Sequence, residues 1–195
     1  MDLTTAFRAE VFRPVMTLLV PGATALAPYA LVVRQQNPNI SGFFERHPLL
    51  ATAILLVAVL ALGFVLEDIG SRIETFWDRR LQRKNNSHIA EWYRYLMLAF
   101  TSEPIGQRYL RTLTLRLKFE LHFGVALLVM LPGYWWLDTI VHLWTLAGFR
   151  WFAGATLVLA VYLLLESATT VGLLAGLRHE LLLRYYPTPG INPTG

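Results

Sequence analysis

Long apolar stretches with few charges dominate the pattern of hydrophobic and polar positions along this chain. A helix needs about 20 consecutive apolar residues to cross a bilayer, and four windows meet or approach that length. These windows cover residues 15–33, 48–66, 121–137 and 151–177. The pattern predicts an all-α integral membrane protein that forms a single membrane domain with four transmembrane helices.

The second span is predicted to continue well past the bilayer. Between Pro48 and Lys84 only Gly63 and Gly70 weaken the helical pattern, so one long rod is expected there. The fourth span is predicted to extend on the same side of the membrane. Together with residues 67–118, these extensions would form a helical region outside the bilayer.

Residues 67–118 are the part of the chain that is large enough to meet something outside the membrane. Their pattern predicts the end of the long second helix, followed by a turn at residues 84–87. A further helix is expected from about His88 to Phe100, with a break at residues 101–104.

Residues 112–123, TLTLRLKFELHF, alternate polar and apolar side chains. This alternation is typical of a half-buried strand, but a lone strand entering lipid would leave its backbone groups unsatisfied. A helix is therefore expected, and the strand is the alternative. On a helix Arg116 would pair with Glu120, four residues on. Arg116 and His122 are also the expected partners of Glu166 in the fourth span.

Composition agrees with the membrane class. Hydrophobic residues make up 55% of the 195 residues and charged residues 15%, whereas soluble domains average roughly 45–50% and 25%. The chain contains no cysteine, so disulfides, thiolate metal sites and a cysteine nucleophile are excluded.

The distribution of Lys and Arg predicts the orientation. The segments before the first span, between the second and third, and after the fourth carry 14 basic residues, whereas the two other loops carry 3. Because basic loops stay in the cytoplasm, both termini and residues 67–118 are predicted to be cytoplasmic, in a multi-pass protein of the inner membrane. An aromatic belt is expected at the outer interface, formed by Trp135, Trp136, Trp144 and Trp151.

Carboxylates stand at or near the ends of two apolar windows. Glu67 and Asp68 follow the second window directly, whereas Glu166 lies within the fourth and is expected to sit deeper. One interpretation is that these charges anchor the helices at the lipid headgroups, with Asp68 paired to Arg72 on the helix surface. The other is that Glu67, Asp68 and Glu166 line an ion path or a gate.

Two halves of the chain share features. The sequences VLALGFVLE at residues 59–67 and VLAVYLLLE at residues 158–166 are identical at five of nine positions. The first and third spans each contain a Pro-Gly pair, at residues 21–22 and 132–133. These features suggest a parallel two-plus-two repeat, and interruptions at corresponding places in two halves can point to a membrane site.

Two further groups predict partners. Ala168, Gly172 and Gly176 form a small-residue stripe on which another helix can approach closely, so a homo-oligomer is expected, with packing inside one chain as the alternative. A basic cluster is expected to contact anionic lipid headgroups or a cytoplasmic protein, and no nucleic acid partner is expected. The cluster consists of Arg79, Arg80, Arg83 and Lys84.

Two classes of function follow from these features. The first is a non-enzymatic oligomer that forms a conduit, such as a channel, or serves as the membrane-embedded sensor or effector subunit of a larger system. Small four-span bacterial proteins with this layout can act in antiviral defence, which is an analogy of size and topology alone. The second is an integral membrane enzyme that processes lipid with interfacial carboxylates and histidines. The first is preferred, and no catalytic residue, cofactor or metal site is predicted, because these side chains lack the short fixed spacings of ligand sets.

Overall fold

The structure is a computed structural model that describes residues 15–83, 88–96, 105–142 and 144–185. All regular structure in these ranges is helical, as the sequence predicts. The elements are the π-helix η1 (Val15–Leu19) and the α-helices α2 (Val20–Gln36), α3 (Pro38–Arg46), α4 (Pro48–Gln82), α5 (His88–Leu96), α6 (Ile105–Val141) and α7 (Leu146–Tyr185).

Four segments are long and apolar enough to cross a membrane: η1 with α2, then α4, α6 and α7. With 35, 37 and 40 residues, the last three are about 52, 55 and 60 Å long at 1.5 Å per residue. Each is longer than the roughly 30 Å of a hydrocarbon core. The predicted class, a multi-pass helical membrane protein, is confirmed.

The described helices agree with some local expectations and differ from others. Residues 112–123 lie within α6, so the helix is confirmed and the strand alternative is wrong. The third span also extends beyond its apolar window, because α6 begins at Ile105. The helix continues through Pro132 without interruption. The helix expected over residues 88–100 is described to Leu96, and residues 97–104 lie outside the described part. Helix α3, in the loop between the first two spans, was not predicted.

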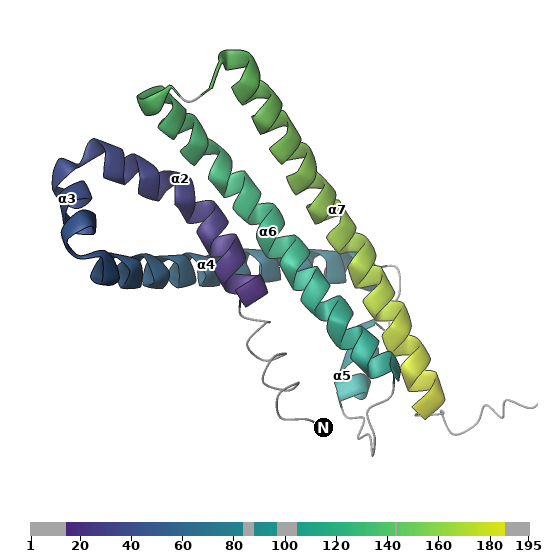
Figure 1. Cartoon of the computed structure of the whole chain (residues 1–195). Coiled ribbons are helices and arrows are strands. Elements are labelled where there is room, and N and C mark those ends of the chain that lie inside the picture. The colour runs from purple at the N-terminus through teal and green to yellow at the C-terminus, as the bar shows by residue number, and fades with distance from the viewer. Residues whose placement is uncertain (1–14, 84–87, 97–104, 143, 186–195) are drawn as a thin grey trace, which may run out of the picture.

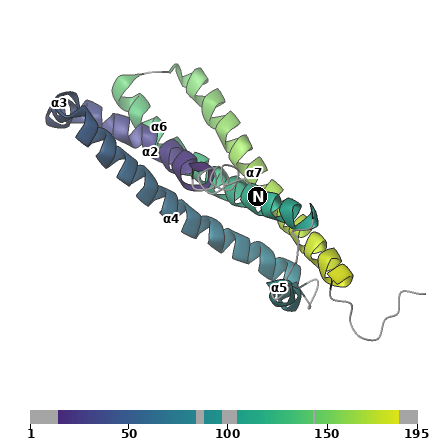
Figure 2. The ribbon, with the colours of Figure 1, turned by 60° about the horizontal axis from the view of Figure 1, so that its bottom comes forward.

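Helix α6 is the centre of the arrangement, because η1, α2, α4 and α7 all pack against it. Helices α6 and α7 run antiparallel and side by side, and α2 crosses α6 on its other flank (Figure 1). Helix α3 and the α6–α7 turn lie at one end of the molecule and α5 lies at the other (Figure 2). These are called the α3 end and the α5 end below.

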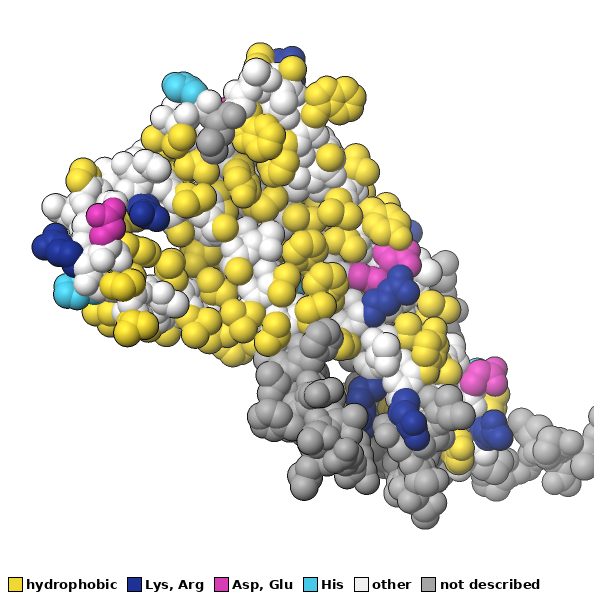
Figure 3. All heavy atoms as spheres, in the orientation of Figure 1, with side chains coloured by type: hydrophobic (Ala, Val, Ile, Leu, Met, Phe, Trp, Pro, Cys, Tyr) yellow, Lys and Arg dark blue, Asp and Glu magenta, His cyan; other side chains and the backbone are white. Residues whose placement is uncertain are grey.

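The largest packed core lies towards the α5 end. It joins Leu residues of α6 to apolar residues of α7, and side chains of α4 and α5 cover it. Its buried members are Leu110, Leu113, Leu117, Leu121, Val171, Leu174 and Leu181. Towards the α3 end the helices are more exposed, and on α4 the side chains of Leu49 and Val57 are 88% and 67% exposed. Hydrophobic side chains cover much of this surface (Figure 3), as expected where lipid is the solvent.

All four Trp residues of the predicted aromatic belt are exposed, with side chains 44% to 82% accessible. They lie on the halves of α6 and α7 nearest the α3 end and in the turn between these helices. The turn itself is fixed by Asp138, whose carboxylate accepts a hydrogen bond from the backbone N–H of Trp144 at 3.0 Å. The four rings therefore gather where α6 ends and α7 begins, as expected for a belt at a membrane interface.

Two glycines allow the first span to contact α4 backbone to backbone. A Cβ atom added to Gly22 would collide with the carbonyl oxygen of Val59, and one added to Gly63 would lie 2.5 Å from the carbonyl oxygen of Leu18. Without a strong hydrophobic force between helices in lipid, such close contact is a main source of association. The Pro-Gly pair of the first span thus serves helix packing.

We expect Gly63→Ala to lower the thermal unfolding midpoint of the purified protein. The added methyl group must push η1 away from α4, and overpacking of this kind typically costs about 1–3 kcal/mol. The matched control is Gly154→Ala in α7, where no described atom lies within 4 Å of the added Cβ. Equal midpoints for the two variants in the same detergent would show that the close approach contributes nothing to stability.

Candidate functional site

Three spanning helices carry a glutamate at a similar distance from the α3 end. Glu67 in α4, Glu120 in α6 and Glu166 in α7 each lie about 20 residues, or about 30 Å, from the terminus of their helix at that end. That distance matches the hydrocarbon thickness of a bilayer. With the two basic residues that pair with them, Arg116 and Lys118, they are called the collar below.

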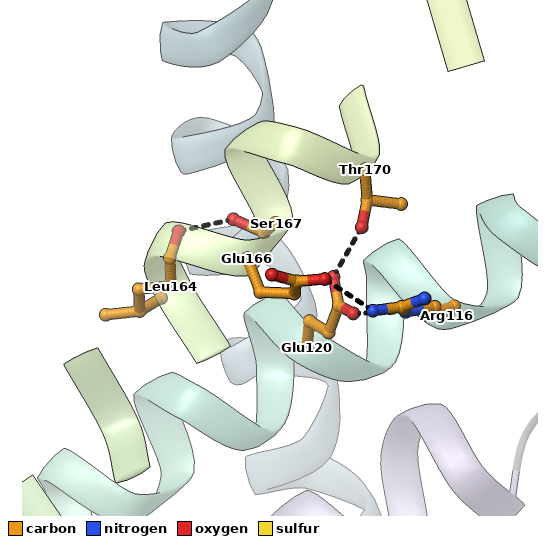
Figure 4. Close-up of polar contacts among 6 residues, drawn as sticks. All are labelled: Arg116, Glu120, Leu164, Glu166, Ser167 and Thr170. Carbon is orange, nitrogen blue, oxygen red and sulfur yellow. Dashed lines mark hydrogen bonds and ion pairs between the residues drawn. The ribbon is translucent and has the colours of Figure 1, made fainter. Parts of the chain in front are cut away.

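Arg116 joins both carboxylates of the α6–α7 interface (Figure 4). Its Nε donates to Oε1 of Glu120 at 2.6 Å, and its Nη2 donates to Oε1 of Glu166 at 2.6 Å. The hydroxyl of Thr170, one turn along α7, donates to Oε2 of Glu120 at 2.9 Å. Both predicted Arg116 contacts, with Glu120 and with Glu166, are confirmed.

Burial makes these contacts energetically important. The side chain of Glu120 is 5% exposed, so its charge is stabilised by Arg116 and Thr170 rather than by water. A charge removed from water without such partners would cost several kcal/mol. The network therefore holds α6 and α7 in one register along their shared interface.

A second ion pair lies on a different side of α6. Nζ of Lys118 donates to Oε1 of Glu67 in α4 at 3.3 Å, and both side chains are partly buried. Arg116 and Lys118 are two residues apart, which corresponds to about 200° around a helix of 3.6 residues per turn. Glu67 and Glu166 are thus each paired with α6 but with different sides of it.

His122 lies where α6 meets η1 and α4, and its side chain is 1% exposed. Its Nδ1 is 2.9 Å from the carbonyl oxygen of Thr17, so a proton on Nδ1 would be donated to that oxygen. A Cβ atom added to Gly70 of α4 would collide with the imidazole ring. His122 was expected to bind Glu166, and the structure instead gives it a backbone partner in the first span. Because Gly70 has no side chain, α4 can approach the imidazole ring closely here.

The remaining predicted residues are not brought into the collar network. Asp68 pairs with Arg72 at 2.9 Å, as expected, and both side chains are more than half exposed. Arg79, Arg80 and Arg83 are exposed, and Lys84 lies outside the described residues. Within the described chain, three His, Asp or Glu side chains do not come together as a group that could hold a metal ion.

Two of the three small residues of the predicted stripe face outwards. Beyond the neighbouring residues and backbone of α7 itself, no described atom lies within 4 Å of a Cβ atom added to Gly172 or Gly176. Ala168 and Gly172 are partly buried, and Gly176 is exposed. Packing of the two glycines against another described span of the same chain is therefore excluded. The face that they form is open to another molecule.

Comparison with protein-family models, with curated proteins and with solved structures found no match to this chain.

We expect Arg116→Gln to destabilise the protein strongly, because it leaves the buried Glu120 and the partly buried Glu166 without their cation. Breaking a buried pair costs roughly 3–5 kcal/mol, and the 49% exposure of Arg116 places the expected loss at the lower end. The control is Arg72→Gln, which removes an exposed pair within one helix and should change stability by about 0.5 kcal/mol or less. Similar denaturant midpoints for both variants would contradict a role of the collar in stability.

Proposed function

We propose that this protein is the membrane-embedded subunit of a larger sensor or effector system, with both termini and the α5 end in the cytoplasm. In this proposal the four spans anchor and position a helical bundle at the α5 end, and that bundle meets a cytoplasmic partner. Copies of the chain associate in the membrane.

The observation that carries the proposal is the pairing of the collar. Glu67 of α4 and Glu166 of α7 each bind a basic residue of α6, so their charges tie helices together. Glu120 pairs with Arg116 within α6 and accepts a hydrogen bond from Thr170 of α7. Side chains that line an ion path within one chain would instead face a shared, water-filled space. This favours an anchoring role for the collar over a conduit through a single four-helix unit.

The position of the main core supports the same proposal. It lies beyond the collar towards the α5 end, where α4, α5, α6 and α7 pack together. A bundle with its own apolar core and exposed Arg79, Arg80 and Arg83 suits contact with a protein or with anionic headgroups. The excess of basic residues in the sequence segments on this side of the spans favours a cytoplasmic location.

The open glycine face of α7 supports association between copies. Gly172 and Gly176 are four residues apart and allow a second helix to approach the backbone closely. A conduit between copies is the second candidate, because the partly exposed Glu166 lies on the same helix.

The proposed orientation predicts opposite accessibility for two single cysteines introduced into this cysteine-free chain. Cysteine at Asn86, between α4 and α5 in the sequence, should react with an impermeant maleimide only after the cells are opened. Cysteine at Thr139, near the α3 end, should react in intact cells. Labelling of both positions from the same side would contradict the proposed topology.

Liposomes distinguish an anchoring subunit from a conduit. We expect the purified wild-type protein to give no ion or proton flux above that of empty liposomes, because each collar carboxylate is paired with a basic side chain of α6. A flux that the wild-type protein supports and Glu166→Gln abolishes would overturn the subunit proposal in favour of a conduit between copies.

Photo-cross-linking in cells tests the partner. A cross-linking residue at Arg79 or Tyr109, both exposed near the α5 end, should capture a discrete protein partner, whereas one at Leu49 or Trp151 should capture lipid or another copy. Equal products from both ends would contradict a partner at the α5 end.

A further inference from the structure

The ion pair between Arg116 and Glu166 lies at the surface of the protein and leaves some of its hydrogen-bonding atoms unused. The two side chains are 49% and 29% exposed although they bind each other at 2.6 Å. Arg116 uses only Nε and Nη2, and Glu166 uses only Oε1. Within the described chain, no further polar contact engages Nη1 of Arg116 or Oε2 of Glu166. One strong donor group and one strong acceptor therefore remain on two side chains that bind each other.

Buried contacts hold this pair in place. Arg116 is fixed from behind by Glu120, which is itself bound by Thr170, and Glu166 is fixed by Arg116 across the helix interface. A ligand that contacts both groups therefore binds side chains that are already oriented, so little conformational entropy is lost on binding. By contrast, the exposed Arg72 is held only by Asp68 of its own helix.

The pair lies where lipid headgroups are expected. It is about 30 Å from the α3-end termini of its helices, which is the depth of the bilayer boundary on the α5 side. From Glu166 towards the α3 end, the same face of α7 exposes apolar side chains: Tyr162 is 56%, Leu165 61% and Val158 70% exposed. In Figure 3, acidic and basic side chains lie together over α6 and α7 next to a larger hydrophobic surface.

We propose that Arg116 and Glu166 form a binding site for the headgroup of a zwitterionic phospholipid with a primary ammonium group, namely phosphatidylethanolamine. The lipid phosphate accepts hydrogen bonds from Nη1 of Arg116, and the ammonium donates to Oε2 of Glu166. The acyl chains lie along Val158, Tyr162 and Leu165. The site belongs to the leaflet on the α5 side, whichever side of the cell that is, so it does not depend on the proposed orientation.

The charges of the site select this headgroup over the alternatives. Two carboxylates, Glu120 and Glu166, share one guanidinium, so the cluster has one negative charge in excess and disfavours an anionic lipid. A choline headgroup has no N–H to donate to Glu166. In ethanolamine the phosphate and the ammonium are joined by a two-carbon link, so both can reach neighbouring groups such as this pair.

The test measures lipid retention by native mass spectrometry of the full chain in detergent, with dioleoyl phosphatidylethanolamine, phosphatidylcholine or phosphatidylglycerol added at equal concentrations. We expect at least about tenfold stronger retention of phosphatidylethanolamine than of phosphatidylcholine, which corresponds to one charge-assisted hydrogen bond. Phosphatidylglycerol should be retained no better than phosphatidylcholine. Equal retention of the ethanolamine and choline lipids by the wild-type protein, or a preference for phosphatidylglycerol, overturns the proposal without need of any variant.

Two variants locate the effect. Glu166→Gln keeps the shape of the side chain and should reduce the preference for phosphatidylethanolamine to about twofold or less. Asp68→Asn removes an exposed carboxylate near the same depth on α4 and should leave the preference unchanged. A preference that persists in Glu166→Gln, or one lost in Asp68→Asn, excludes the site between α6 and α7.

Two competing occupants give distinct results. If soluble phosphoethanolamine displaces the lipid at equal concentration, the site binds a soluble ligand and the lipid proposal is wrong. If the wild-type protein forms a dimer that retains no phosphatidylethanolamine, a second copy covers the pair instead. An ion flux from the wild-type protein, or the absence of a cross-linked partner, would leave the lipid result unchanged, so failure here is separate from failure of the proposed function.

Discussion

The pairing of charge between helices, about 30 Å from the α3 end, is the constraint on which this structure depends. Helix α6 carries Arg116 and Lys118 on two of its sides, and neither charge can face hydrocarbon at low cost. Each is balanced by a glutamate from a neighbouring helix, α7 on one side and α4 on the other. The depth of α6 in the membrane therefore determines the depth of both neighbours.

The distribution of packing follows from this arrangement. On the α5 side of the collar, apolar side chains of α6 and α7 form the largest core, with α4 and α5 covering it. On the other side, α4 exposes most of its apolar surface, and lipid must cover that surface. Small residues support contacts within this half: Gly22 and Gly63 let the first span reach α4, and Gly133 leaves room for Tyr29, whose hydroxyl binds the carbonyl oxygen of Val129 at 2.8 Å.

Sequence patterns were sufficient for the class, the four spans and the Arg116–Glu120 pair, because apolar length and four-residue spacing are local properties. The greater depth expected for Glu166 stays a prediction, whereas its expected pairing with Arg116, fifty positions away on another helix, is confirmed. The contact of His122 with Thr17 was missed, since a backbone carbonyl has no signature in the sequence. Helix α3 was missed because its polar and Gly residues resemble a loop.

The contact between Thr17 and His122 has a consequence for how the protein is made. These residues are 105 positions apart, and one complete further span, α4, lies between them in the sequence. The first span is therefore synthesised long before its partner in α6, and of the spans that pack against it only α4 is made earlier than α6. The bundle can close only after α6 has been made, and the π-helical segment that carries Thr17 gains its contact with His122 at that stage.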